Sequence, residues 1–236
     1  ASWVGDPEDS DLRKNASIEK LNRIKIQSDF FKPKFIIPFA SFVKFSHKDN
    51  HYMNDHINKI KNVEKFILEK TNSIPIILYP GDEWSGGKKI NNLPAIEQYE
   101  LDTQKTFELH SNLKTISFEE LKNLSSSYIK NIKLRNNWNF IKLLHKINFF
   151  KTTHIFLKDL NSSYSFNLVN GLENSQKNKS DVDIITDSDS LGFVFSWDYG
   201  MDTLFVNARF RTSGGKINNF FRLFLIGTLN NNGRTF

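Results

Sequence analysis

Three histidines and two carboxylates lie close together near the start of the chain, where they could do chemistry. His47, His51 and His56 fall within ten residues, together with Asp49 and Asp55. Imidazole and carboxylate groups at such short range are the ligands that transition metals prefer. Their spacing matches no ligand motif, so histidines in an exposed polar loop are the alternative. His47 is the strongest single candidate because it lies nearest the apolar segment before the loop.

That apolar segment, Phe35–Phe39, is predicted to be a buried strand. Ligands in open α/β sheets bind beyond the carboxyl ends of strands, which is where the loop begins. A helix is expected before the strand, over 12–27, and another from Asn58. A second buried strand is predicted over Ile74–Tyr79. The order helix, strand, helix, strand indicates an α/β sheet covered by helices.

The second half of the chain changes from a helical to an alternating pattern. Helices are predicted between Leu93 and Phe150, with Ser117 and Glu120 as a capping box. Strands are predicted at His154–Leu157, Tyr164–Leu168, Val182–Ile185 and Thr203–Phe210. An exposed loop is expected over Asn170–Asp181. Further helices are expected after Ser188 and over Ile217–Leu229. This half is therefore predicted to be α+β, with helices packed on one sheet.

Composition narrows the classes of protein to consider. The 236 residues carry a net charge of +6 without a run of five like charges, so we expect no nucleic-acid partner. The absence of cysteine excludes thiolate metal sites, iron–sulfur clusters and a cysteine nucleophile within these residues. No apolar run approaches the roughly 20 residues of a transmembrane helix. We therefore expect a cytoplasmic protein without a membrane span.

Three segments carry a resemblance to a known family. The run PFASFVKFSH, which ends at His47, the nearby Tyr52 and the later YPGD (Tyr79–Asp82) resemble the C-terminal half of the CMP-N-acetylneuraminate hydroxylase family and its bacterial relatives. Those relatives have the metallo-β-lactamase fold, a four-layered αββα sandwich. The segment GMDTLFVNARF and the aromatic helix after it are similar to the family's closing region, a sterol-carrier-type α+β domain.

The resemblance implies two parts. Residues 1–92 would be the C-terminal portion of a metallo-β-lactamase-like domain, and residues 93–236 a helical segment followed by a sterol-carrier-like domain. The first metal motif of that fold, HxHxDH, does not occur in the sequence. We therefore expect the chain to be a fragment of a longer protein whose other residues complete the site.

The resemblance also implies an active site. The family's last metal histidine falls at Ala40, which cannot bind a metal. Either His47 serves instead as metal ligand or acid–base group, or this branch of the family has a different site. Tyr52 and Asp55 would be further catalytic residues, at the mouth of the active site. The cofactor would be a divalent transition metal, zinc or iron. The reaction would be hydrolysis or oxygenation of a small polar substrate such as a nucleotide sugar.

The alternative function is that of a non-catalytic module that binds an apolar or lipid-like ligand. The ligand would lie between the sheet of the second half and its Phe-rich helix. A cavity beneath Phe220, Phe221 and Phe224 would favour this function, and a solid core there would count against it. Core packing is the usual role of such aromatic residues.

Overall fold

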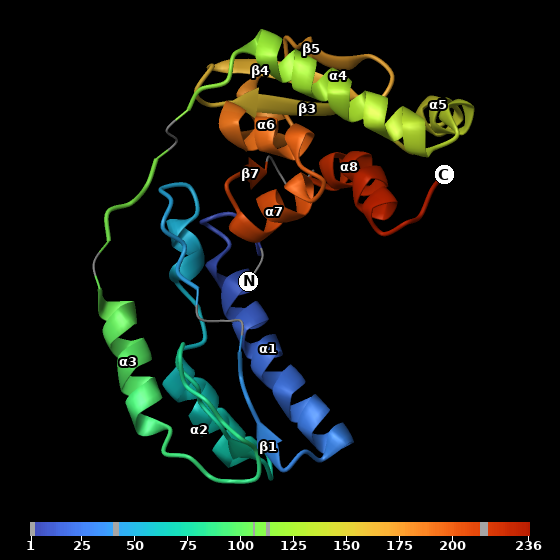
Figure 1. The fold of residues 1–236 in the computed structure, drawn as a ribbon. Coiled ribbons are helices and arrows are strands. Elements are labelled where there is room, and N and C mark those ends of the chain that lie inside the picture. Colours follow the sequence, from blue (N-terminus) through green and yellow to red (C-terminus); the bar gives the residue numbers. More distant parts are fainter. Residues whose placement is uncertain (1–2, 40–42, 106, 112–113, 213–216) are drawn as a thin grey trace. The chain divides into compact units, whose positions relative to one another are not determined.

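The computed structural model describes residues 3–39, 43–105, 107–111, 114–212 and 217–236 (Figure 1). The chain forms two compact units, Trp3–His110 and Ser111–Phe236. Each contains helices and a sheet, which confirms the predicted mixed α/β class. The helix α3 (Leu93–Gln104) belongs to the first unit, because its Ala95 and Ile96 are buried in that unit's core. The predicted boundary lies at the start of this helix, and the observed one lies beyond its end.

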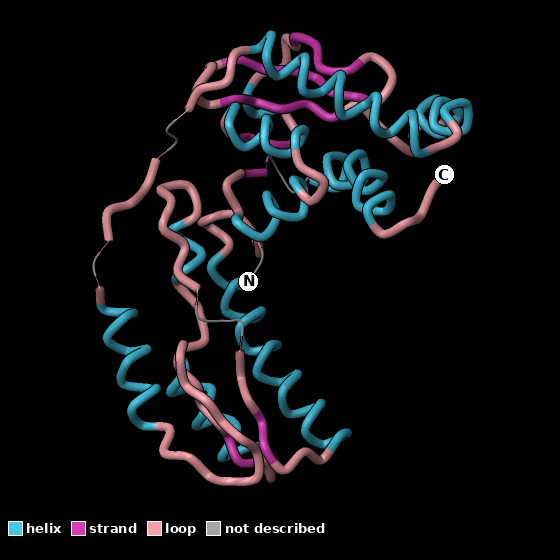
Figure 2. The backbone as a smooth tube through the Cα atoms, in the orientation of Figure 1, coloured by secondary structure: helices cyan, strands magenta, loops and turns pink. Residues whose placement is uncertain are grey.

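In its described residues the first unit contains three α-helices and a very small sheet. The helix α1 (Ser10–Phe31) precedes the strand β1 (Phe35–Ile36), and α2 (Ile60–Lys70) precedes β2 (Ile74–Pro75). The two strands pair in parallel and are the short magenta segments at the lower end of the tube in Figure 2. This is the predicted order of elements, although both strands are shorter than expected.

Proline and a side-chain hydrogen bond account for the short strands. The N–H of Ile76 donates to the carbonyl of Ile36 at 2.9 Å. The next amide, that of Ile77, donates instead to Oδ1 of Asn92 at 2.9 Å. On the other strand Pro38 has no N–H to offer. The two predicted strands therefore end after two residues each.

The core of the first unit forms on one face of α2. Ile60, Val63 and Ile67 are buried there, as expected from apolar residues spaced three and four positions apart. Leu21 and Ile24 of α1 pack against them. These contacts hold α1 and α2 together.

The second unit is built on a five-stranded mixed sheet in the order β5-β4-β3-β6-β7. Its strands are β3 (Thr153–Leu157), β4 (Ser162–Asn167), β5 (Gly171–Asn174), β6 (Ile184–Thr186) and β7 (Arg211–Thr212). The central strand β3 pairs antiparallel with β4 and in parallel with β6. The strands predicted at β3, β4 and β6 are thus confirmed.

Five α-helices in the described part of this unit accompany the sheet. They are α4 (Phe118–Arg135), α5 (Trp138–Lys146), α6 (Ser188–Ser196), α7 (Gly200–Asn207) and α8 (Ile217–Asn231). The predicted cap of α4 is confirmed, because Oγ of Ser117 accepts the N–H of Glu120 at 3.2 Å. The cap of α6 is Asp187, whose carboxylate accepts the N–H of Ser190 at 2.7 Å. Within the described residues no helix combines the length and apolarity needed to cross a membrane.

Two predictions for the second unit were wrong. The segment Thr203–Phe210, predicted as a strand, lies mostly in the helix α7. Met201, Leu204 and Ala208 are buried, and their spacing of three and four positions gives a helix one apolar face. The loop predicted over 170–181 contains the edge strand β5, which pairs with β4 through its backbone.

Aromatic rings from several elements fill the core of the second unit. Phe166 of β4 stacks on Phe224 of α8 with ring centroids 5.4 Å apart, and Phe195 of α6 lies 4.9 Å from Phe166. The ring of Tyr128, on α4, lies 5.4 Å from that of Phe224. The helices α4, α6 and α8 therefore pack on the same face of the sheet, beside which Figure 1 draws them.

The end of α8 is fixed to the junction between α4 and α5. Asn136 and Asn230 exchange side-chain hydrogen bonds of 2.8 and 3.0 Å. Asn136 also accepts the N–H of Phe236 at 2.9 Å. These hydrogen bonds join residues that are far apart in the sequence and complete the packing of the second unit.

Candidate functional site

The loop over 43–58 carries the three residues predicted to be catalytic, and Asn54 sets its shape. Oδ1 of Asn54 accepts the N–H of Phe45 at 2.9 Å, and Nδ2 donates to the carbonyl of Phe45 at 2.8 Å. One side chain thus satisfies both backbone groups of Phe45, as a neighbouring strand would. The backbone around His47 pairs with His110, whose N–H donates to the carbonyl of Ser46 at 2.8 Å.

Arg13 of α1 is buried beside this loop and contacts two of its residues. Its side chain is 3% exposed, and its two terminal nitrogens donate to the carbonyls of Asp6 at 2.5 Å and Pro7 at 2.7 Å. The guanidinium lies over the Tyr52 ring, 4.9 Å from its centroid, and 3.5 Å from Oδ2 of Asp55. Two of the three predicted residues therefore meet at an arginine that sequence reasoning did not select.

Further hydrogen bonds tie the loop to the segment that begins the first unit. The Tyr52 hydroxyl donates to the carbonyl of Gly5 at 3.2 Å. Nε2 of His56 lies 2.8 Å from Oγ of Ser10. These groups are therefore occupied within the fold, whereas the Asp55 side chain is half-exposed. Asp55 is the member of the set best placed to meet a ligand.

The His47 ring is turned into its own loop. Nδ1 accepts the N–H of Asp49 at 3.1 Å and lies 3.6 Å from the Asp49 carboxylate, while Nε2 is buried. A nitrogen that accepts a hydrogen bond offers no lone pair to a metal. The neutral ring then carries its proton on Nε2, which cannot act as a ligand in that tautomer. This arrangement does not favour metal binding, and an acid–base role would require Nε2 to become accessible to the substrate.

The described residues do not fit a metal centre. No three histidine, aspartate or glutamate side chains in the described part of the chain gather closely enough to hold an ion. Ala40, at the position where the resemblance implies a metal histidine, lies outside the described residues. A zinc or iron ion would therefore need ligands other than those described.

Comparison with known protein families, with curated proteins and with solved structures finds no match to this chain. The relationship implied by the segments PFASFVKFSH and YPGD stays a prediction. What the loop can do is given by its geometry, in which a buried guanidinium supports an aromatic ring and a half-exposed carboxylate. Such a surface suits polar groups that donate hydrogen bonds.

Tyr79, in the YPGD segment, belongs to a second polar cluster of the first unit. Its hydroxyl donates to Oδ2 of Asp102 at 2.6 Å, and Nζ of Lys105 donates to Oδ1 at 2.6 Å. The hydrogen bond to Asp102 raises the pKa of Tyr79 above its usual 10.0. Lys105 first, and then Tyr79, lower the pKa of Asp102. A phenol that is harder to ionise does not suit a general base. The hydrogen bond to Asp102 instead joins the segment after β2 to α3.

Replacing Tyr79 with phenylalanine is expected to move the pKa of Asp102 only part of the way back to its usual 3.8, because Lys105 is the larger cause. Lys105→Met should move the pKa further. A carboxyl whose pKa is lowered by folding stabilises the fold above its unfolded value and loses that effect as the pH falls through the folded value. Carbon-detected NMR titration of Asp102 measures both shifts, and the opposite order would contradict the assignment.

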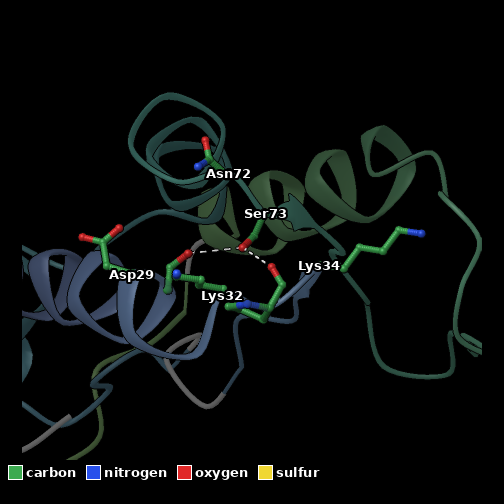
Figure 3. Close-up of a pocket in the computed structure, with 7 residues that line it drawn as sticks. Asp29, Lys32, Lys34, Asn72 and Ser73 are labelled. Atoms are coloured by element: carbon green, nitrogen blue, oxygen red, sulfur yellow. Dashed lines mark hydrogen bonds between the residues drawn. The ribbon is translucent and has the colours of Figure 1, made fainter.

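A hollow of about 310 Å³ lies at the end of α1 (Figure 3). It is lined by Ser28, Asp29, Lys32, Pro33, Lys34, Asn72 and Ser73. The hydroxyl of Ser73 donates to the carbonyl of Pro33 at 2.6 Å and lies 3.2 Å from that of Ser28. Figure 3 shows that the side chain of Lys34 points away from it. Because its hydroxyl groups serve the junction between α1 and β1, we assign the hollow no chemistry.

The aromatic residues of α8 form packed contacts rather than an open space. Phe220 and Phe224 are buried with ring centroids 4.8 Å apart. The ring of Phe221 lies 4.9 Å from that of Phe205 on α7. These contacts count against a ligand cavity directly beneath the three rings.

Proposed function

We propose that the first unit is the C-terminal part of a metallo-β-lactamase-type hydrolase or oxygenase that acts on a small polar substrate such as a nucleotide sugar. One observation carries the proposal: Tyr52 and Asp55 are both held by the buried Arg13, in the loop that follows β1. A half-exposed carboxylate fixed in this way is a positioned acceptor for the hydroxyl groups of a substrate.

The small sheet of the first unit supports the same proposal. Parallel strands are normally covered on both faces within larger sheets, and a pair of two-residue strands is not a stable sheet by itself. On the outside of α1, Ile26, Phe30 and Phe31 are exposed. We infer that residues outside this chain complete the sheet and cover this surface.

The metal of such an enzyme, zinc or iron, would be bound by those other residues. His47 would act beside it as an acid–base or positioning group, since Nδ1 is engaged by Asp49. Tyr52 and Asp55 would line the mouth of the site and orient the substrate. The 236-residue chain alone is then expected to be inactive.

Elemental analysis tests this division of the site. Metal should be present in the longest natural form that carries sequence upstream of Ala1 and absent from the 236-residue chain. Both proteins must be shown to be folded by circular dichroism. Folded protein without metal in either form would overturn the proposal.

His47→Ala in that longer form is expected to lower kcat by about a hundredfold or more, the usual contribution of an acid–base group. The matched control is His51→Ala, because His51 lies in the same loop and is exposed. Steady-state kinetics of the two variants gives the comparison. Unchanged activity in His47→Ala would remove this residue from the site.

A second candidate function is the binding of an apolar or lipid-like ligand by the second unit. Phe193 and Trp197 stack on the surface with ring centroids 5.8 Å apart, and both are exposed together with Tyr199. Titration with a fluorescent fatty-acid analogue tests this function. Trp197→Ala should weaken binding and Trp84→Ala, in the first unit, should not. Absence of binding would leave the enzyme proposal as the only one.

A further inference from the structure

The basic character of this protein is concentrated in one segment of the second unit. From Leu121 to Lys158 the sequence contains no aspartate or glutamate and eight lysines or arginines, against a net charge of +6 for the whole chain. They are Lys122, Lys130, Lys133, Arg135, Lys142, Lys146, Lys151 and Lys158. The segment covers most of α4, all of α5 and β3.

The helix α5 carries an apolar stripe on its outer side. Ile141 is fully buried and holds the helix on the unit, whereas Phe140, Leu143 and Ile147 are 43%, 51% and 62% exposed. These three residues are spaced by three and four positions, so they lie on one face. Phe140 and Leu143 belong to the helix, and Ile147 caps its C-terminus. Leu134, at the end of α4, is 76% exposed. These four exposed apolar residues are thus grouped around the junction of α4 and α5.

Basic side chains border this stripe. Lys142 and Lys146 are exposed and one helical turn apart, and Lys146 lies three positions from Leu143 and therefore beside it. Nζ of Lys133 lies 4.6 Å from the centre of the Trp138 ring. Apolar side chains bordered by lysines on a short surface helix form the pattern of a helix that lies in a membrane interface.

We propose that α5, with the end of α4, docks this protein on the surface of an anionic lipid bilayer. Phe140, Leu143 and Ile147 enter the boundary between headgroups and acyl chains, and Lys142 and Lys146 pair with anionic headgroups. Exposed aliphatic side chains favour lipid over nucleic acid, which is held by phosphate contacts and by bases stacked on aromatic rings. This inference does not depend on the function proposed for the first unit.

Sedimentation of the 236-residue chain with vesicles tests the proposal. The chain should bind vesicles of phosphatidylcholine and phosphatidylserine, bind those of phosphatidylcholine alone much more weakly, and dissociate as salt is added. Lys142→Ala/Lys146→Ala should weaken partitioning about 25-fold, about fivefold for each lysine. Leu143→Ser/Ile147→Ser, which leaves the charge unchanged, should also weaken it. Circular dichroism should show that both double variants remain folded.

The matched control is Lys61→Ala/Lys65→Ala, since these lysines of α2 are also exposed and one turn apart. This variant should bind anionic vesicles as the parent chain does. Equal weakening in both lysine variants, or no loss in Leu143→Ser/Ile147→Ser, would overturn the proposal by showing that binding follows net charge alone. Absence of binding to anionic vesicles would also overturn it. Tighter binding to single-stranded RNA than to vesicles would do so in favour of nucleic acid.

Discussion

Replacement of Phe224 by alanine is expected to lower the free energy of unfolding of the second unit by about 4 kcal/mol. Its ring centroid lies within 5.8 Å of those of Phe166, Phe195 and Phe220. Because these rings are held by a strand and two helices, they cannot move far enough to fill the space that the ring leaves. Urea denaturation followed through hydrogen exchange of the β3 and β4 amides measures the loss.

The neighbouring residue Leu225 supplies the control, because it lies on the same helix and is exposed. Leu225→Ala should change the free energy of unfolding by less than about 1 kcal/mol. Similar losses for the two variants would show that Phe224 does not lie in a packed core. Such a result would restore the ligand cavity beneath α8 as a serious possibility.

Arg13→Met is expected to lower the free energy of unfolding of the first unit by about 3 kcal/mol. Methionine fills a similar volume but removes the donor to the carbonyl of Pro7 and one of the two donors to the carbonyl of Asp6, which keeps the N–H of Asp9. It also removes the cation over the Tyr52 ring. A hydrogen bond from a charged donor contributes about 1.5 to 3 kcal/mol to stability, and the loss of such bonds accounts for the expected change. Hydrogen exchange of the amides of α1 gives the free energy of opening for this unit.

Arg23→Met, also in α1, provides the comparison for Arg13. Arg23 is exposed and pairs with Glu19, one turn away, at 2.5 Å. Such surface pairs contribute little, so the expected change is within about 0.5 kcal/mol. If the two arginine variants lost the same stability, Arg13 would not be the buried centre of the candidate site.

Local patterns in the sequence predicted much of the fold. The helix α2 could be predicted because Ile60, Val63 and Ile67 repeat at helical spacing within one short segment. The segment of α7 could not, because Leu204 and Ala208 fit both an alternating strand and one face of a helix. Packing of that face against the rest of the unit decides between the two, and such packing is not a local property.

The candidate site could be predicted only in part. Tyr52 and Asp55 stand out as polar residues just after an apolar segment. Arg13 does not, because it lies in a helix rich in charged residues and its partner Asp55 is 42 positions away. The role of His47 also depends on a hydrogen bond that the sequence does not reveal, the one from Asp49 to Nδ1.

The parallel pairing of β3 with β6 affects how the second unit can form during synthesis. The strand β4 can pair with β3 as soon as both leave the ribosome. The pairing of β3 with β6, which places Ile155 opposite Ile184, cannot form until Ile184 has been synthesised. Phe166 must wait still longer, until Phe224 emerges with α8. A ribosome that stalled before α8 would therefore present a partly formed sheet with an uncovered aromatic face, which chaperones and proteases recognise.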